Sequence, residues 1–419
     1  MKKFFYLSLG CKVNSYESNA LKEEFTKEGY IYSEIDPDVI FINTCSVTAT
    51  ADQKSRQHIR KLMNKYPNAI SVVMGCYSQG HHKFIFDEIK PNIVVGTSNR
   101  SQIPSLIKKF ELDHKNIDLT EDKPRFFSYE ELGINKYSEM ARAYLKIEDG
   151  CDNFCSYCLI PYIRGKMRSR PYNEILDEAK ALVSHGYKEI VLTGIHIGGY
   201  GKDLEGNINF SSLVRDLLDI PNLYRLRISS LEASEIDEEL IHLINTRSNL
   251  AKHFHIPLQS GSDTVLKRMN RKYDCETFYN TLSMIRKACP NVAFTTDVIV
   301  GFPGESEEEF LETYNFIKKC EFNMLHVFPF SSREGTLASK MPNHINPAIK
   351  KERTLRLIEL SNELWNKYTD QFVNQEVEVL VEQYSKDKKV SIGHTTNYLE
   401  VAIPEEYPEG SIVKTVYKK

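Results

Sequence analysis

Short apolar runs alternate with amphipathic segments along the first part of the chain. The apolar runs are residues 4–9, 39–43, 70–74 and 93–95, and helical periodicity is clear over residues 15–28, 49–65 and 100–110. Strands that alternate with helices predict a parallel sheet. Residues 108–137 are polar with little periodicity, which predicts a linker. We therefore expect an open α/β domain over residues 1–130.

The alternation resumes at residue 141 and gives six β/α units. The expected strands are residues 143–147, 189–193, 223–228, 253–257, 293–300 and 324–328. The expected helices are residues 172–185, 211–219, 234–245, 262–269 with 275–288, and 307–319. Six such units predict an incomplete TIM-like barrel. With a last amphipathic helix over residues 347–368, this domain is expected to span residues 137–368.

Residues 371–419 have a different pattern of short strands. The candidates are residues 376–382, 389–394, 398–403 and 412–417. They predict a small all-β barrel or sandwich. The predicted fold class is thus α/β, with a small all-β module at the end of the chain.

Composition narrows the class of protein. Hydrophobic residues make up 41% of the 419 residues and charged residues 26%, as in ordinary soluble domains. No apolar run reaches the roughly 18 residues of a membrane span. The segment before Cys11 superficially resembles a lipoprotein signal, but its apolar stretch is shorter than a normal signal core. We therefore expect a cytoplasmic protein with no membrane segment.

The strongest local motif is Cys151-Asp-Asn-Phe-Cys155-Ser-Tyr-Cys158, directly after the first expected barrel strand. Three thiolates so close in sequence can hold one soft metal centre. A four-iron cubane with three cysteine ligands leaves one iron to chelate S-adenosylmethionine, and electron transfer then yields a 5′-deoxyadenosyl radical. The alternative is a zinc loop whose fourth ligand lies elsewhere.

Three further cysteines, Cys11, Cys45 and Cys76, each follow an apolar run of the N-terminal domain. The carboxyl ends of parallel strands share one sheet edge, where ligands bind, so we expect these thiols to converge. Gly10 and Gly75 let the backbone approach a bulky cluster. The alternative is that they are buried cysteines at strand ends by chance. The remaining cysteines show no common spacing and are interpreted as packing residues: Cys275, Cys289 and Cys320.

These motifs together resemble the radical-SAM methylthiotransferase family. Close matches to family segments are Arg227–Ser230, His255–Gly261 and Gly301–Glu305. The terminal β module is similar to the TRAM domain, an RNA-binding fold. Segments 10–18, 43–48 and 51–56 are similar to the branch that methylthiolates N6-threonylcarbamoyladenosine beside the anticodon of tRNA. Other branches modify isopentenyladenosine in tRNA or an aspartate of a ribosomal protein.

The resemblance implies two 4Fe-4S clusters and S-adenosylmethionine as cofactors. One S-adenosylmethionine donates a methyl group to sulfur on the cluster at Cys11, Cys45 and Cys76. A second is cleaved at the other cluster, and its radical removes hydrogen from C2 of the adenine, to which the methylthio group transfers. tRNA is the implied partner, together with an electron donor such as a flavodoxin or ferredoxin and a sulfur source. A rival of another class is a zinc-stabilised RNA-binding protein without catalysis.

The resemblance also points to residues that bind S-adenosylmethionine, each of which has a simpler structural reading. Gly194 and His196 belong to a segment that meets the amino group, or to an ordinary βα turn. Gln259 and Ser260 contact the ribose, or cap a loop. The candidates are Tyr157, Gly194, His196, Gln259, Ser260, Gly301 and Gly304.

Basic residues after the cysteine loop are the predicted tRNA contacts, because phosphates attract such side chains. They are Arg164, Lys166, Arg168 and Arg170, which show no clear helical period. The terminal module departs from the expectation for an RNA-binding fold. Residues 371–419 contain six lysines, no arginine and eight acidic residues, whereas such modules are more often basic.

Overall fold

A computed structural model describes residues 1–121, 128–134 and 141–419 of the protein. It divides into two compact units. The first consists of Met1–Tyr137, Lys146–Phe154 and Cys158–Arg170, and the second of Ser138–Leu145, Cys155–Tyr157 and Pro171–Lys419. The three-domain boundaries expected from the sequence stay a prediction.

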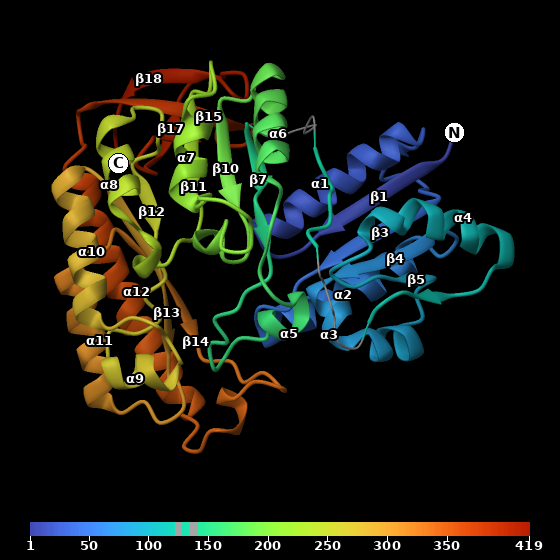
Figure 1. Ribbon diagram of the computed structural model, residues 1–419, viewed down its shortest axis with the longest axis horizontal. Coiled ribbons are helices and arrows are strands. Elements are labelled where there is room, and N and C mark those ends of the chain that lie inside the picture. Colours follow the sequence, from blue (N-terminus) through green and yellow to red (C-terminus); the bar gives the residue numbers. More distant parts are fainter. Residues whose placement is uncertain (122–127, 135–140) are drawn as a thin grey trace. The chain divides into compact units, whose positions relative to one another are not determined.

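The first unit is built on a parallel six-stranded sheet (Figure 1). Its strands are β1 (Lys3–Ser8), β2 (Ile31–Tyr32), β3 (Val39–Thr44), β4 (Ile70–Gly75), β5 (Ile93–Val94) and β6 (Ile117–Asp118), in the order β2-β1-β3-β4-β5-β6. The chain first builds outward from β1 to β2, and then in the opposite direction from β3 to β6. Strand order therefore reverses between β1 and β3, which is where open α/β sheets bind ligands.

Helices cover both faces of this sheet. On one face α1 (Lys12–Lys27) and α4 (Ile103–Asp113, preceded by the 3₁₀ turn Arg100–Gln102) bury Phe25 and Ile107 against Phe41. On the other face lie α2 (Ala49–Lys65) and α3 (Cys76–Phe84), which continues as the π-helical turn Ile85–Ile89. The predicted sheet is confirmed. The predicted linker over 108–137 is wrong at its start, because α4 continues to Asp113 and β6 joins the sheet.

The barrel strands of the second unit follow chain order. They are β7 (Arg142–Lys146), β10 (Glu189–Thr193), β11 (Arg225–Ile228), β12 (His253–His255), β13 (Ala293–Val300) and β14 (Met324–Pro329). Two three-stranded sheets, β11-β10-β7 and β12-β13-β14, are joined by parallel bridges from Leu226 to Leu250 and from Ser230 to His255. The arrangement is the open partial barrel that the sequence predicts.

Helices between these strands lie where the sequence predicts them. They are α6 (Tyr172–Ser184), α7 (Phe210–Leu218), α8 (Glu238–Thr246), α9 (Asp263–Arg268), α10 (Cys275–Ala288) and α11 (Glu307–Cys320). In the first unit, a short strand pair, β8 (Glu148–Asp149) with β9 (Arg168–Ser169), and helix α5 (Ile160–Arg164) flank the cysteine loop.

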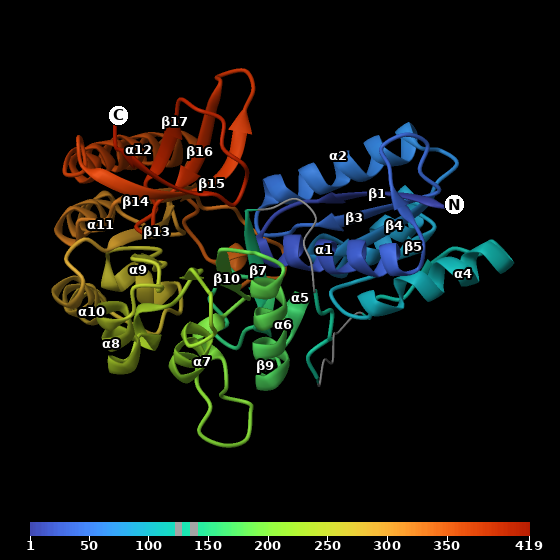
Figure 2. The ribbon, with the colours of Figure 1, turned by 90° about the horizontal axis from the view of Figure 1, so that it is seen from above.

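The C-terminal strands form an antiparallel sheet next to α12 (Pro347–Asp370), as both ribbon views show (Figure 2). The strands β15 (Glu376–Ser385), β16 (Val390–His394), β17 (Glu400–Ile403) and β18 (Ile412–Val416) have the order β17-β16-β15-β18. Val379, Val401 and Ile403 pack with Tyr368 of α12. The four predicted strands are confirmed. Within the described part of the chain, no helix is both long and apolar enough to cross a bilayer.

Candidate iron–sulfur and cofactor sites

The three dispersed cysteines lie at the carboxyl ends of neighbouring strands. Cys11 follows β1, Cys45 directly follows β3, and Cys76 directly follows β4. These strands are consecutive in the sheet, and the point of strand reversal lies between the first two. Cys45 and Cys76 are buried, whereas Cys11 is exposed. The expected sharing of one sheet edge is confirmed.

Gly10 and Gly75 are required by the packing at this edge. Both have left-handed backbone angles, with φ of +99° and +100°. A Cβ atom on Gly10 would lie 2.6 Å from both Cβ and Sγ of Cys45, and one on Gly75 would overlap Asn43 and the backbone of Thr44. Any larger residue would therefore displace a cysteine or its strand.

Asn14 ties two of the strand ends together. Its Nδ2 donates to the carbonyl of Leu9 at 2.7 Å and to the carbonyl of Thr44 at 3.0 Å. Its Oδ1 accepts from Nη2 of Arg164 at 3.2 Å and lies 3.9 Å from Sγ of Cys11. Asn14 was not predicted from the sequence. Its position three residues after Cys11 places it on the same helical turn, and this spacing could have identified it as a neighbour of the cysteine.

Burial controls the protonation of the two inner thiols. Burial raises the pKa of Cys45, and it raises the pKa of Cys76 to about 12 even though Arg164 acts to lower it. The Cys11 thiol raises both pKa values further. These thiols are neutral near pH 7, and binding a metal centre would release their protons.

The donor set fits an iron–sulfur cluster. Three thiols at one sheet edge are the soft ligands that such clusters use. Among the residues that the structure describes, no three His, Cys, Asp or Glu side chains are already gathered around a single metal ion's position.

The residues of the second cysteine motif are divided between the two units. In the first unit, the amide of Cys151 donates to the carbonyl of Gly165 at 3.1 Å. In the second unit, Sγ of Cys155 accepts from Nη1 of Arg271 at 3.2 Å. Arg271, whose side chain is 5% exposed, also lies 2.8 Å from Glu232 and donates from Nε to the hydroxyl of Tyr273 at 3.1 Å. Sequence reasoning noted Arg271 only as one of a cluster of basic residues and did not connect it with the cysteine loop.

Two of the predicted cofactor residues occupy a loop at the carboxyl end of a barrel strand, and a third packs against a separate apolar cluster. Gly194 and His196 follow β10, and Nε2 of His196 lies 2.7 Å from Glu235. Tyr157 packs against a cluster that includes Met269 and Phe302. Its predicted contact with the adenine of S-adenosylmethionine stays a prediction.

The other predicted cofactor residues also follow barrel strands. Gln259 has a φ of +65°, and its amide donates to the carbonyl of Asp297 at 2.8 Å. Ser260 is buried, with its hydroxyl 3.0 Å from that of Thr313, which favours loop capping over a ribose contact. Gly301 and Gly304 have positive φ values.

Gly301 directly follows β13 and packs against the side chain of Lys350. A Cβ on this residue would overlap the side chain of Lys350, which explains the glycine without a ligand. Its amide donates to Glu305 at 3.1 Å, and Glu305 in turn accepts from Nη1 of Arg353 at 2.7 Å. This ion pair fixes the turn that the sequence assigned to the cofactor.

The predicted tRNA contacts after the cysteine loop are wrong for the three arginines. The exposed fractions are 0% for Arg164, 7% for Arg168 and 2% for Arg170. Their guanidinium groups are bound to protein groups: Arg164 to Glu17, Arg168 to backbone carbonyls, and Arg170 to Glu131. Lys166 is exposed.

Polar side chains of β12 and β13 contact one another, at positions to which sequence reasoning assigned no function. His255 lies 2.9 Å from the hydroxyl of Thr295 through Nδ1 and 3.3 Å from Asp297 through Nε2. His253 lies 3.0 Å from the same hydroxyl. The alternating positions 295 and 297 put these groups on one face of β13.

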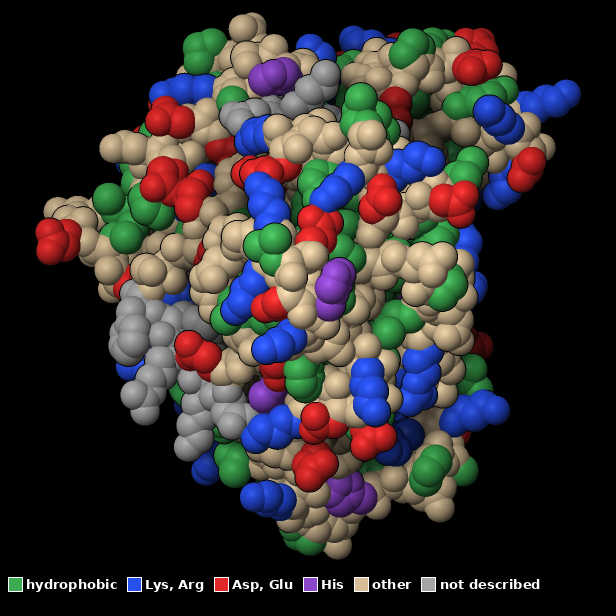
Figure 3. Space-filling view, turned by 90° about the vertical axis from the view of Figure 1, so that its right-hand side faces the viewer, with side chains coloured by type: hydrophobic (Ala, Val, Ile, Leu, Met, Phe, Trp, Pro, Cys, Tyr) green, Lys and Arg blue, Asp and Glu red, His purple; other side chains and the backbone are tan. Residues whose placement is uncertain are grey.

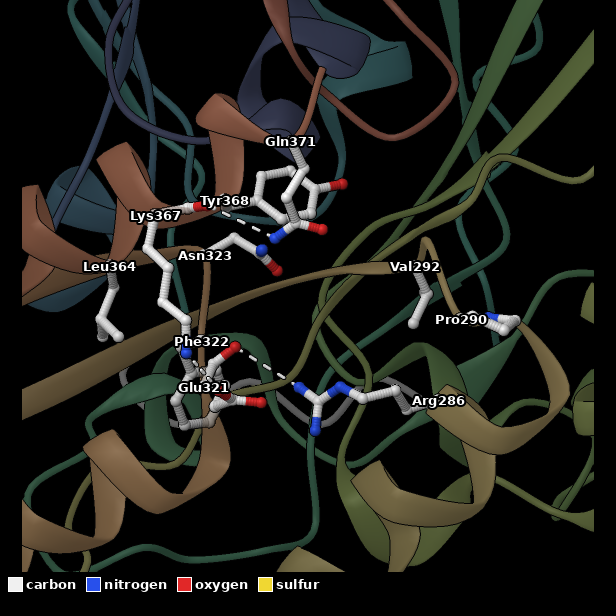
Figure 4. Close-up of a pocket in the computed structure, with 10 residues that line it drawn as sticks. All are labelled: Arg286, Pro290, Val292, Glu321, Phe322, Asn323, Leu364, Lys367, Tyr368 and Gln371. Carbon is white, nitrogen blue, oxygen red and sulfur yellow. Dashed lines mark hydrogen bonds and ion pairs between the residues drawn. The ribbon is translucent and has the colours of Figure 1, made fainter. Parts of the chain in front are cut away.

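A separate pocket of about 140 Å³ is lined by the end of α10, by the segments that follow α10 and α11, and by the last turns of α12 (Figure 4). Its charged side chains already have partners: Arg286 donates to the carbonyl of Cys320 at 2.9 Å, and Lys367 lies 2.5 Å from Glu321. We assign it no ligand.

Family models match both the N-terminal α/β domain and the barrel. A model of the radical SAM superfamily matches residues 145–317, and a model of the uncharacterized protein family UPF0004 matches residues 3–96. The structure resembles the radical S-adenosylmethionine methyltransferase TsrM from Kitasatospora setae, with a TM-score of 0.63 at 13% identity, over 81% of this chain and 77% of that one. The likeness to TsrM shows the fold, and the match to the radical SAM family model, which contains the Cys-x-x-x-Cys-x-x-Cys loop, indicates a radical-SAM enzyme.

Relatives with similar sequences show which radical-SAM family the chain belongs to. The chain is 44% identical to threonylcarbamoyladenosine tRNA methylthiotransferase MtaB of Bacillus subtilis over 97% of this chain and 92% of that protein. It is 37% identical to tRNA-2-methylthio-N(6)-dimethylallyladenosine synthase of Clostridium novyi, over 92% of this chain and 87% of that one. The chain belongs to the radical-SAM methylthiotransferase family. It is therefore an enzyme that uses 4Fe-4S clusters and S-adenosylmethionine, and the non-catalytic zinc protein is excluded.

Proposed function

We propose that this enzyme methylthiolates C2 of N6-threonylcarbamoyladenosine beside the anticodon of tRNA. The observation that carries the proposal is the row of three cysteines at the reversal point of the N-terminal sheet, in a chain with a radical-SAM cysteine loop. The higher identity to the threonylcarbamoyladenosine enzyme, 44% against 37%, supports this substrate.

The two cysteine sets have separate roles in this proposal. Cys151, Cys155 and Cys158 hold the cluster that binds S-adenosylmethionine, and Cys11, Cys45 and Cys76 hold the auxiliary cluster. When bound, the first supplies the electron that cleaves S-adenosylmethionine and the second supplies the sulfur. Gly10, Gly75 and Asn14 fix the directions of the auxiliary thiols, because they set the ends of β1, β3 and β4.

The barrel loops orient S-adenosylmethionine. We assign Gly194 and His196 to its amino group, Gln259 to its ribose, and Tyr157 and the turn Gly301–Gly304 to its adenine. The ion pair from Glu305 to Arg353 keeps that turn rigid.

Contacts with tRNA come from exposed lysines rather than from the buried arginines. Basic and acidic side chains are interspersed over the face in Figure 3, so local groups decide the binding. The turn between β15 and β16 carries Lys386, Lys388 and Lys389, all exposed. We assign this turn, on the TRAM-like module, and Lys166 to tRNA phosphates.

A cytoplasmic location, a flavodoxin or ferredoxin as electron donor, and a separate sulfur source belong to the same proposal. Dimethylallyladenosine is the second candidate substrate, because relatives at 37% identity are named for it. Modification of a ribosomal-protein aspartate is a third possibility, which only the family resemblance supports.

Mass spectrometry of tRNA nucleosides from strains with and without the gene tests the substrate. Loss of 2-methylthio-N6-threonylcarbamoyladenosine, restored by the gene, is expected. Loss of the methylthio-dimethylallyl nucleoside would establish the second candidate. Unchanged tRNA nucleosides with loss of a methylthio group from a ribosomal protein would establish the third.

A further inference from the structure

Arg164 is held rigidly inside the first unit. It is the last residue of α5, and its side chain has no solvent exposure. Nη1 donates to Glu17 Oε1 and to Asp149 Oδ1, both at 2.9 Å. Nη2 donates to Asn14 Oδ1 at 3.2 Å and to Glu17 Oε2 at 3.3 Å. These bonds occupy the four hydrogens of the two terminal nitrogens and leave the Nε hydrogen.

The Nε hydrogen of Arg164 is directed at sulfur. Nε lies 3.3 Å from Sγ of Cys76, which is itself buried. A neutral thiol is a weak acceptor, whereas a sulfur that carries negative charge makes a stronger, charge-assisted bond. A buried cation that presents its last donor to a cysteine is therefore matched to a metal-bound thiolate.

The surrounding ion pairs explain why the guanidinium cannot turn away. Glu17 is also bound by Arg100 and lies 3.0 Å from Lys146, and Asp149 lies 2.7 Å from Lys146. All five side chains are buried. Buried ion networks are weak sources of stability, since hydrophobic replacements are often as stable. The network around Arg164 is better explained by the need to hold the guanidinium in one orientation.

We propose that Arg164 is a positioning residue of the auxiliary cluster: its Nε–H holds the sulfur of Cys76 and raises the reduction potential of the cluster. Hydrogen bonds to ligand sulfur are one of the protein's means of setting such potentials. The inference rests on the proposed ligand role of Cys11, Cys45 and Cys76. Because α5 begins two residues after Cys158, a single short segment carries a ligand of one cluster and a donor to a ligand of the other.

The test uses the full chain with Cys151, Cys155 and Cys158 all changed to Ala, so that only the auxiliary cluster assembles. Its reduction potential is measured by titration with electron paramagnetic resonance detection. The test variant is Arg164→Gln with Glu17→Gln, and the control is Arg100→Gln with Glu17→Gln. Each pair removes one positive and one negative buried charge, which limits the loss of stability. Only the test variant loses the donor to sulfur.

We expect the potential of the test variant to be more negative than that of the control, at equal iron content. Equal potentials overturn the role of Arg164 while leaving the cluster in place. If the three-alanine background binds no iron, the ligand assignment fails, and the inference fails with it. Should the test variant not fold, Arg164→Lys against Arg100→Lys gives the same comparison, because lysine keeps the charge and lacks the fixed Nε–H.

Discussion

The imidazole of His394 stacks on the ring of Tyr398, with centroids 4.6 Å apart and planes 25° apart. Tyr398 also stacks on His253 of the barrel strand β12 at 4.6 Å. Nδ1 of His394 lies 2.7 Å from Oε1 of Glu382 on the neighbouring strand β15. The stacked pair of His394 and Tyr398 therefore links the C-terminal sheet to the barrel.

This link makes the stability of the second unit depend on pH. Burial lowers the pKa of His394 to about 4, assisted by the guanidiniums of Arg142 and Arg227. An unfolded histidine has a pKa of about 6.5. Between these values the unfolded chain binds a proton that the folded chain does not, so stability falls as pH drops from about 6.5 toward 4.

Urea unfolding at pH 6.5 and pH 4.5 measures the effect. His394→Gln should remove about 2 kcal/mol of the wild-type loss between these pH values, since each pKa unit corresponds to roughly 1.4 kcal/mol. His242→Gln, at an exposed position on α8, is the control and should keep the wild-type dependence. An unchanged dependence in His394→Gln would show that this link does not titrate.

Single cysteine changes should separate the two cluster roles. Cys45→Ala is expected to retain S-adenosylmethionine cleavage and lose methylthiolation, whereas Cys151→Ala should lose both. Iron should fall from about eight atoms per chain to about four in each, since each cubane has four. Cys289→Ala, which changes a cysteine that we assign to packing, is the control. Methylthiolation by Cys45→Ala would refute the sulfur-donor role.

Regular elements of the fold could be predicted because their periodicity is strong. The observed bounds of α2, β10, α10 and β13 are the predicted ones. No bounds could be predicted for α3, because its sequence, Cys-Tyr-Ser-Gln-Gly-His-His-Lys-Phe, is short, polar and contains glycine. β6 is only two residues long and is defined by its parallel pairing with β5. Such elements depend on tertiary contacts that local sequence does not contain.

The site was predictable where spacing or strand ends carried the signal. The cysteines and Gly10 were found in this way. The partners of Arg164 were not, because Glu17 is 147 residues away in sequence. A run of arginines without helical period has the same appearance on a surface and in a buried ion network. Only the fold decides between the two.

Gly10→Ala should prevent assembly of the auxiliary cluster. The new Cβ would lie 2.6 Å from Sγ of Cys45, so the thiol has to move. Gly29→Ala is a matched control, since it has a comparable φ of +84° and no atom within 4 Å of the added Cβ. Both changes add backbone strain of roughly 1 kcal/mol. Only Gly10→Ala should lose about half of the iron. Equal iron contents would mean that the cysteine edge adapts to the methyl group.

The turn Lys386–Lys389 supplies the last prediction, on tRNA affinity. Changing Lys386, Lys388 and Lys389 together to Gln should weaken tRNA binding about tenfold at moderate salt. Each lost phosphate contact reduces the salt slope of the binding constant by about 0.7 to 0.9. Titrations at several salt concentrations should therefore give a shallower slope, by roughly 2 if all three lysines reach phosphates.

The control for this prediction neutralises three exposed lysines on the outer barrel helices, Lys287, Lys318 and Lys319. It changes the net charge by the same amount, so any difference between the two variants reports position rather than total charge. An equal loss in both would mean that tRNA responds to overall charge alone. An unchanged slope in the turn variant would remove this turn from the tRNA contacts and leave Lys166 as the remaining assigned lysine.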